Sequence, residues 1–314
     1  MPSLPHALAL AGTLLLACTA HEPAPAIPSV DPTSPAALAR TLAIELPAPA
    51  GQVVPHGPAL WLGPEILAFV GSDARLHRLD DAEIQAAMIG DLYDLLAADP
   101  TTTSLDLYID RRVTMLRLAP ILYTAGRASR TPLRLVGGPP EQPAALAIEL
   151  PPMFSDHPDA KPPFGRLAAD LLVVWGVGGV VASARPRPAE RAPFGLDHEE
   201  PAPGQPDLPS LLPERVPLRA PERAGLLDPH ALARIAADLC SFNDGPLGVS
   251  LAPTRDVDHA ALMRFAAAIA QPCTTEIRLN LTTGDAALDP DAVTVTELAT
   301  RLRALTRDHG AVAR

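Results

Sequence analysis

Aromatic residues make up only 4% of this 314-residue chain, although 47% of its residues are hydrophobic. A core must therefore be built mainly from Leu, Val, Ile and Ala, and the length favours two domains. Lysine is almost missing, since Lys161 is the only one among 25 basic residues. The formal net charge is −11. It argues against a nucleic-acid partner and against a polybasic membrane-surface domain, because both need a basic face.

A long apolar run is also missing from the start of the chain. Ala7–Ala17 is shorter than the roughly 20 residues of a membrane-spanning helix and has the length of the hydrophobic region of a signal peptide. The run ends in "LLAC" at Cys18, which resembles the bacterial lipobox, although no Lys or Arg precedes the run. The alternatives are a short buried helix and an ordinary secretory signal.

The lipobox resemblance implies an address for the protein. Residues 1–18 would be a lipoprotein signal peptide, with Cys18 as the lipid attachment site. The mature chain would be periplasmic and would touch the membrane through its lipid anchor only. The residue after the cysteine is Thr19 rather than Asp, which favours the outer membrane over the inner one.

Cysteine is scarce, with three residues in the whole chain. Once Cys18 is set aside for lipidation, Cys240 and Cys273 remain. They can form a disulfide in an oxidising compartment, or they can be two buried small apolar residues. No spacing resembles a metal site, so neither a metal nor another cofactor is predicted.

Two segments are rich in proline and poor in any pattern. Residues 19–39 are predicted to form a semi-rigid tether, because Pro-rich sequence favours extended conformations. Residues 185–224 are predicted to be a disordered insertion, since proline neither continues a helix nor pairs within a central strand.

The rest of the chain contains an internal repeat that begins with "LAIELP" at Leu42–Pro47 and again at Leu146–Pro151. A hairpin pattern follows each copy, at Ala59–Gly71 and Leu171–Ser183, and each half continues with an amphipathic helix. Ser104–Val136 then aligns with Gly248–Asn280 without a gap, with seven of 33 positions identical at a constant offset of 144.

This repeat predicts two tandem units of the form β-ββ-α-β-α-β, in which "LAIELP" is the entry strand. Each unit would be a two-layer sandwich of the α/β (α+β) class. The predicted domains are residues 40–140 and 141–281, followed by a tail, 282–314, with a helix around Val295–Thr306. The tail either caps the second unit or is loose.

Several helix features are specific enough to test. Asp80 and Glu83 stand at capping-box spacing, and Asp228 and Asp258 are predicted N-caps, with Pro229 at the first helical position. Pro120 predicts a late start or a kink in its helix. The residues expected to face inward are Ile84, Met88, Leu92, Leu95 and Leu96 in the first unit, and Leu232, Ile235, Ala236, Leu239, Leu262, Phe265 and Ile269 in the second.

This order of elements resembles the periplasmic domain of the ExbD/TolR family. "IELP" matches the entry segment of that domain, and "YIDRRVTMLRLAPILYTAG…PLRLV" matches its main pattern with Asp110, Val113, Gly126 and Leu133. The second copy is degenerate, with Thr254 in place of the Asp and an Ala in place of the Gly. The resemblance implies pairing of the domain with itself, with energy-transducing envelope proteins or with peptidoglycan.

The chain lacks the family's transmembrane helix with its proton-conducting Asp, so a proton-translocating role is not expected. No G-x-S-x-G, H-E-x-x-H or P-loop pattern is present in the sequence. Asp110 has two interpretations, a contact with a partner or a turn residue that accepts local backbone hydrogen bonds.

The sequence therefore predicts a non-catalytic envelope adaptor that binds a protein or peptidoglycan through exposed sheet edges. It also predicts that the chain can form a homodimer. The adaptor would be accessory to a TonB/Tol-like energised transport system. The alternatives are a structural spacer between membrane and wall, and an envelope enzyme whose site is assembled from distant residues.

Overall fold

The computed structural model describes most of the chain between residue 34 and residue 312. The described ranges are 34–51, 55, 57–80, 88–98, 104–128, 132–150, 169–176, 178–186, 215–243, 245–280 and 287–312, with side chains described up to residue 304. The predicted signal peptide, Cys18 and most of the predicted tether lie outside these ranges.

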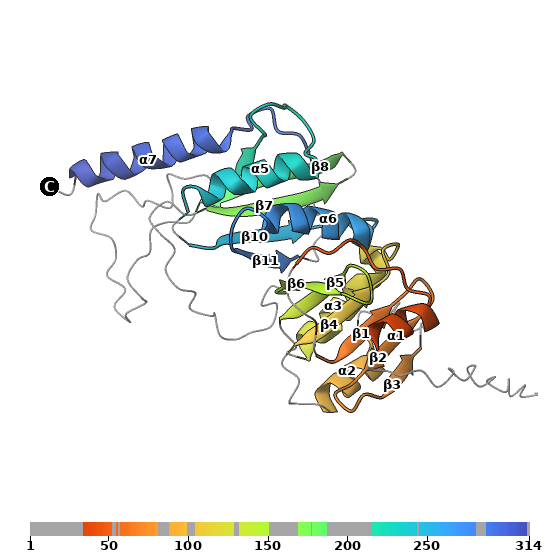
Figure 1. The fold of residues 1–314 in the computed structure, drawn as a ribbon. Helices are drawn as coiled ribbons and strands as arrows, with labels where there is room; N and C mark the ends of the chain where they lie inside the picture. The colour runs from red at the N-terminus through yellow and green to blue at the C-terminus, as the bar shows by residue number, and fades with distance from the viewer. Residues whose placement is uncertain are drawn as a thin grey trace, which may run out of the picture. The chain divides into compact units, whose positions relative to one another are not determined.

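The first half forms a mixed six-stranded sheet of order β3-β2-β1-β4-β5-β6 (Figure 1). The central strands β1, β4 and β5 are parallel, and β2, β3 and β6 are added antiparallel. The strands are β1 Ala59–Leu62, β2 Leu67–Val70, β3 Leu76–Leu79, β4 Leu105–Ile109, β5 Leu133–Gly137 and β6 Ala144–Ile148; the helices are α1 Pro35–Thr41, α2 Gly90–Ala98 and α3 Met115–Arg127.

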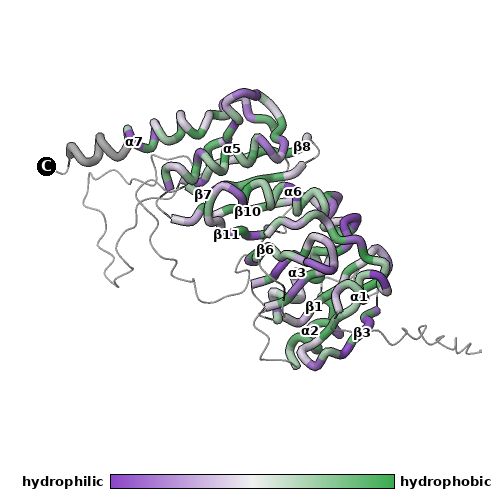
Figure 2. Tube along the Cα trace, in the orientation of Figure 1, coloured by the Kyte–Doolittle hydropathy of each residue, from purple (hydrophilic) through white to green (hydrophobic). Residues whose placement is uncertain are grey.

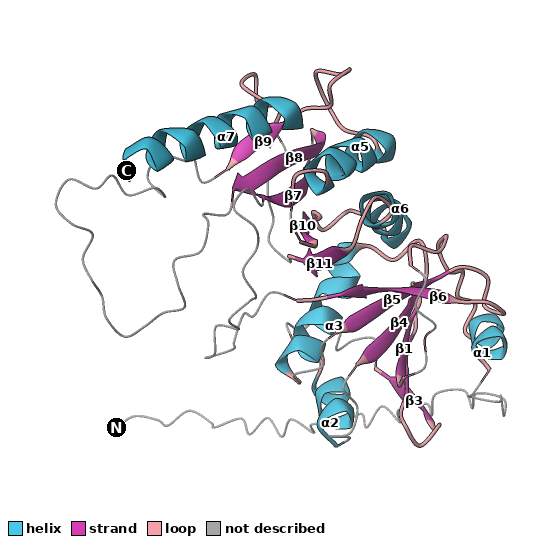
Figure 3. Cartoon of the chain, turned by 60° about the vertical axis from the view of Figure 1, so that its left-hand side comes forward, coloured by secondary structure: helices cyan, strands magenta, loops and turns pink. Residues whose placement is uncertain are grey.

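Both faces of this sheet are covered. Helices α2 and α3 lie on one side and α1 lies on the other (Figure 3). Trp61 and Tyr108 belong to the face under α1 and are 0% and 4% exposed, with stacked rings 4.0 Å apart. The predicted two layers are therefore the sheet and the helices α2 and α3. On the other face of the sheet, α1 and the segment after it form an additional layer that was not predicted.

The second half forms a mixed five-stranded sheet of order β11-β10-β7-β8-β9. Burial alternates along β7 and β8, as in a sheet whose core lies mainly on one face. The elements are β7 Ala169–Gly176, β8 Gly179–Pro186, β9 Val216–Leu218, α5 Pro229–Cys240, β10 Leu247–Ala252, α6 His259–Ala270, β11 Thr275–Leu279 and α7 Val295–Val312.

The two sheets share one topology, because β11-β10-β7-β8-β9 repeats β5-β4-β1-β2-β3 with the same parallel and antiparallel pairings. Leu107 pairs with Leu60, and its counterpart Leu251 pairs with Val173. Leu60 therefore corresponds to Val173. If the two hairpin ranges of the sequence, Ala59–Gly71 and Leu171–Ser183, are aligned from their first residues, Leu60 is matched with the residue before Val173. The sequence-based match is therefore wrong by one residue.

The two halves meet at the loops that enter α3 and α6, and Asp31–Arg314 form one compact unit. Met115 N–H donates to the Val257 carbonyl over 2.9 Å, and His259 N–H donates to the Val113 carbonyl over 2.8 Å. The two bonds are equivalent under the repeat, because His259 is the counterpart of Met115 and Val257 is the counterpart of Val113, each 144 residues later. A second such pair joins Leu116 N–H to Arg255 and Ala260 N–H to Arg111. This exchange is the signature of a two-fold, self-complementary interface.

The prediction that "LAIELP" is an entry strand is wrong. Leu42–Pro47 follows α1 and contains no strand. Leu146–Ile148 end β6, which pairs with β5 of the first sheet rather than opening the second. Glu149 then donates to Ile277 and accepts from Leu279, over 2.8 and 2.9 Å. The segment bonds on both sides, antiparallel to β5 through β6 and parallel to β11 through Glu149.

The proline-rich predictions extend too far. Pro35–Ala39 were assigned to the tether but belong to α1, where Ser34 caps the helix and Pro35 takes the first position, at which its missing N–H costs nothing. The insertion was predicted from Arg185, yet β8 runs to Pro186. Val216–Leu218 form β9, an edge strand, where proline is tolerated. Residues 187–214 lie outside the described residues.

Most of the helix predictions hold. Asp228 and Asp258 cap α5 and α6, the inward residues predicted for these helices are buried, and the tail helix is α7, with Leu298 and Leu302 buried. Helix α3 starts at Met115 and contains Pro120. Of the two expectations for this proline, a late start and a kink, the late start is therefore wrong, and the kink stays a prediction. Met88 is 42% exposed instead of buried, and Glu83 and Ile84 lie outside the described residues.

Candidate functional site

The first sheet ends in an edge strand, β3, for which β2 is the only pairing strand among the described residues. Hydrogen-bonded and non-bonded pairs alternate along an antiparallel ladder. The Gly71 N–H donates to the Arg75 carbonyl, so Phe69–His77 and Leu67–Leu79 are also hydrogen-bonded pairs. The N–H and C=O groups of Leu76 and Arg78 therefore point away from β2, towards the side of β3 on which none of the described strands lies.

The side chains of β3 add charge to this edge. Figure 2 shows hydrophilic colour at β3, whereas β1 is largely hydrophobic. Arg78 is exposed, and His77 lies on the core side with its ring 6.5 Å from that of Phe69. Arg75 is paired with Asp73 at the turn before the strand. An edge of this kind offers backbone hydrogen bonds to an added strand.

The corresponding edge strand of the second sheet, β9, is covered by another segment of the chain. Pro217 has no N–H to offer, and its carbonyl accepts from Val293 N–H over 3.0 Å. The Arg219 N–H donates to the Val293 carbonyl over 2.9 Å, so Val293 forms a parallel bridge with Leu218. The β9 edge is therefore occupied by Val293 of the chain's own C-terminal part, whereas β3 has no partner besides β2 among the described residues.

Asp110, which the sequence singled out, lies at the end of β4 with its side chain 0% exposed. Its carboxylate accepts from Arg112 N–H over 2.9 Å, from the Arg112 guanidinium, and from Glu45 N–H over 2.9 Å. Burial alone would raise the pKa of Asp110, but these hydrogen bonds hold it below its usual value. The contacts are internal, as in the turn interpretation, and they tie the segment after α1 to the loop that enters α3.

A second buried ion pair lies on the face under α1. Arg134 and Asp106 are paired and almost fully buried, and Gly57 N–H donates to Asp106 over 2.8 Å. A Cβ on Gly57 would lie 2.6 Å from the Arg134 guanidinium, so a side chain at this position would have to displace part of the buried ion pair. Burial, with the negative charge of Asp106 beside it, raises the pKa of Tyr108 above its ordinary value. The cluster fastens residues 57 and 58 to the sheet.

His259 is the titratable side chain that the sequence did not distinguish. It opens α6 at the junction of the two halves, is 0% exposed, and neither ring nitrogen has a hydrogen-bond partner in the described structure. Its counterpart in the first half is Met115, which is also buried. Burial lowers the pKa of His259 to about 3, against a smaller opposing effect of Asp110. The imidazole is therefore neutral at the junction.

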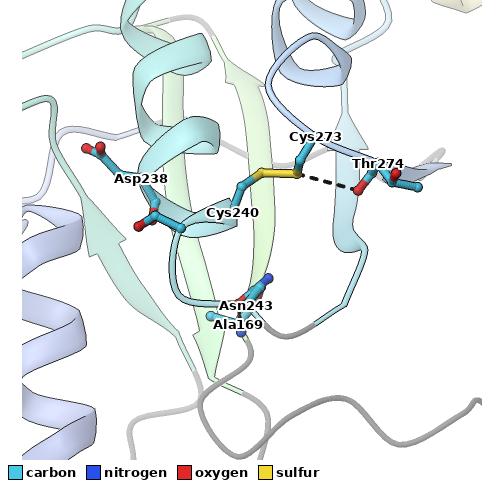
Figure 4. Close-up of a disulfide and its surroundings, with 7 residues drawn as sticks. Ala169, Asp238, Cys240, Asn243, Cys273 and Thr274 are labelled. Atoms are coloured by element: carbon cyan, nitrogen blue, oxygen red, sulfur yellow. Dashed lines mark hydrogen bonds between the residues drawn. A yellow bond between two sulfur atoms is a disulfide. The ribbon is translucent and has the colours of Figure 1, made fainter.

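Cys240 and Cys273 are joined in a disulfide in the structure, with their Cα atoms 6.3 Å apart (Figure 4). Cys240 ends α5, and Cys273 precedes β11, so the bond ties these two elements together. Nearby, the Asn243 side chain donates to Ala169 and accepts from it over 3.1 and 3.0 Å. These contacts fix the start of β7 to the end of α5.

One groove of about 460 Å³ lies beside the ends of β4 and β5. It is lined by Ile44–Pro49 and Gly138–Pro140, and its one ionisable side chain, Glu45, is paired with Arg111 over 3.0 Å. An enzyme site assembled from distant residues would place a carboxylate and a histidine with shifted pKa values in one pocket, and no histidine lines this groove. In the described part of the chain no group of three or more His, Cys, Asp or Glu side chains is placed to hold a metal ion.

Comparison with family models, with curated proteins and with solved structures finds no match for this chain. None of the described helices has the length and apolar character needed to cross a bilayer. The geometry of the sheet edges is therefore the basis for a functional proposal.

Proposed function

We propose that this protein is a non-catalytic adaptor of the bacterial envelope that binds an extended segment of a partner protein at the β3 edge. The observation that carries the proposal is the outward direction of the Leu76 and Arg78 backbone groups at an edge where β2 is the only paired strand described. Free strand edges are a common way to recognise peptides, and the corresponding edge at β9 is already filled by Val293.

The envelope location rests on two features. The Cys240–Cys273 disulfide suits an oxidising compartment, and the "LLAC" sequence ending in Cys18 suits a lipid anchor. The resemblance to ExbD/TolR periplasmic domains agrees with both and suggests that the partner belongs to an energised envelope complex. A protein partner is favoured over peptidoglycan because strand addition needs a peptide backbone in extended form.

The proposal is tested by site-specific photo-crosslinking of the full-length chain in cells. A photoreactive residue replaces Arg75, which lies beside the β3 edge, and a matched control replaces Arg264, an exposed arginine on α6. Each is also made with Arg78→Pro, which removes one outward N–H without breaking the β2–β3 ladder. We expect an adduct with a defined envelope protein at position 75 that Arg78→Pro abolishes.

The adducts at the control position should not change with Arg78→Pro. Equal adducts at positions 75 and 264, or adducts at 75 that survive Arg78→Pro, would refute binding at this edge. Such a result would favour the spacer or the enzyme alternative. Equal thermal stability of the Arg78→Pro variant and the parent chain shows that the edge, and not the fold, has been changed.

A further inference from the structure

The covered edge at β9 shows how a segment binds to this type of sheet. Val293 N–H donates to the carbonyl of Pro217 and its carbonyl accepts from Arg219 N–H, so the segment runs parallel to β9 opposite Leu218. The Val293 side chain is 5% exposed. One residue of the segment thus forms hydrogen bonds with two outward-facing groups of the edge, the Pro217 carbonyl and the Arg219 N–H.

The segment continues directly into α7. Thr294 and Glu297 cap each other reciprocally: Thr294 N–H donates to the Glu297 carboxylate over 2.7 Å and Glu297 N–H donates to the Thr294 hydroxyl over 3.3 Å. The same carboxylate lies 3.8 Å from the Arg219 guanidinium. The bound element is therefore an extended apolar residue followed by a capped helix whose Glu faces an arginine of the edge strand.

The internal repeat assigns each residue of β9 a counterpart in β3. Because Leu60 corresponds to Val173, each residue of the first hairpin corresponds to the residue 113 positions later. The pair Leu62–Leu67 therefore matches the pair Trp175–Val180. By the same offset, Phe69 corresponds to Ala182. Phe69 pairs with His77, and Ala182 pairs with Leu218.

His77 is therefore the counterpart of Leu218, and both lie on the helix-covered side of their sheets. It follows that Leu76 matches Pro217 and Arg78 matches Arg219. Val293 uses two groups on β9, a carbonyl and the N–H two residues later. The matching groups on β3, the Leu76 carbonyl and the Arg78 N–H, are among those that point outward.

We propose that the partner segment at β3 has the form of this chain's own residues 291–297. An apolar residue would lie opposite His77, with its N–H donating to Leu76 and its carbonyl accepting from Arg78. The segment would run parallel to β3 and lead into a helix whose Glu, four residues later, faces Arg78. This inference rests on the proposed function and specifies its ligand.

An exposed apolar side chain in the first half agrees with this ligand. Helix α7 packs on α5, and the counterpart of α5 in the first half is α2, where Met88 is 42% exposed beside the helix start. An apolar contact is thus available for the ligand's helix. Because the second edge is already filled by Val293, each chain would bind one partner segment.

A fluorescein-labelled peptide covering residues 289–303 of this chain, titrated with the full chain, tests the inference by fluorescence anisotropy. We expect saturable binding with a stoichiometry of one. Arg78→Pro should weaken it about tenfold or more, since a backbone hydrogen bond and the charge pair are both lost. Arg78→Ala, which keeps the N–H, should weaken it less.

The peptide also carries its own controls. Glu297→Gln in the peptide should weaken binding to the parent chain as much as Arg78→Ala does, and should have no further effect on the Arg78→Ala chain. Val293→Pro in the peptide, which removes the donated N–H, should abolish binding. No binding of the parent peptide, or equal binding to the Arg78→Pro chain, would overturn the inference.

The two proposals fail separately. If the peptide does not bind while the crosslinks at position 75 still depend on Arg78, the edge binds a partner of another form and only this inference is lost. Concentration-dependent association of the unliganded chain that Arg78→Pro removes would show that a second copy of this chain occupies the β3 edge. That result would overturn the proposed function, which assigns this edge to a different protein.

Discussion

At the scale of single residues, His259 makes stability depend on pH. Its pKa in the folded chain is about 3, below the ordinary value of 6.5, because burial disfavours the charged imidazole. The stability that depends on the neutral imidazole is complete above pH 6.5 and is lost as the pH falls towards 3. Asp110, the charged group that acts on this imidazole across the junction, opposes the shift.

We therefore predict that lowering the pH from 7.5 to 5 costs the wild-type chain about 2 kcal/mol of unfolding free energy through this residue. His259→Met, which places the residue of the first half in the second, should remove that part of the pH dependence. Urea unfolding at the two pH values measures it. An unchanged pH dependence in His259→Met would contradict the prediction.

Asp110 is predicted to matter for stability. Its side chain is fully buried, and Asp110→Ala would leave the Glu45 and Arg112 N–H groups without their acceptor. The expected loss is about 3 kcal/mol.

Asp256→Ala is the matched control, because Asp256 lies in the corresponding loop of the second half but is exposed; its effect should be within about 0.5 kcal/mol. Chemical denaturation of both variants decides the matter, and equal losses would show that the buried contacts are not important.

Residues whose role is local were predictable from the sequence. Asp228 and Asp258 cap helices because their partners lie three residues away. The hydrogen bond from Arg112 to Asp110 follows from turn chemistry in the same way. The contact between Asp110 and Glu45 spans 65 residues, and only the folded chain brings them together. Nothing near His259 marks it, and only its alignment with Met115 could have drawn attention to it.

At the scale of elements, the disulfide between α5 and the segment before β11 should stabilise the second half. It closes a loop with a sequence separation of 33, for which about 4 kcal/mol is expected. The double variant Cys240→Ser/Cys273→Ser should lose this amount, and a reducing agent should lower the thermal midpoint of the parent chain but not of the variant. A midpoint that does not respond to reduction would mean that the bond contributes little.

The order of elements could be predicted further than their pairing. The gapless alignment of Ser104–Val136 with Gly248–Asn280 gave the matching strands and helices, because both copies keep the same apolar periodicity. The first "LAIELP" was misread as a strand, since six residues with an apolar majority are also compatible with an irregular segment packed on a sheet. The pairing of Val293 with β9 was not predictable from the sequence. Its partner strand contains a proline, which argues against a strand, and lies about 75 residues earlier in the chain.

At the scale of the whole molecule, the exchange of hydrogen bonds between the two halves predicts where a new crosslink would form. Thr114 and Asp258 face each other as a non-hydrogen-bonded antiparallel pair. Their Cα atoms should be about 4.5 Å apart, which suits a disulfide. Thr114→Cys/Asp258→Cys is expected to form this bond within one chain, seen by peptide mapping and by a monomeric band without reductant. A covalent dimer would instead indicate that the halves pair between copies.

The covered edge at β9 and the proposed binding edge at β3 have a mechanical consequence. The chain enters the described fold at α1, which packs on the first sheet, and the proposed partner is held at β3 of that same sheet. A pull between an N-terminal anchor and the partner would therefore be carried by the first half alone, through α1, the hydrogen bond from Glu45 to Asp110 and the ladders from β4 to β3. The second half would remain outside the line of force and could keep its fold while the first is under load.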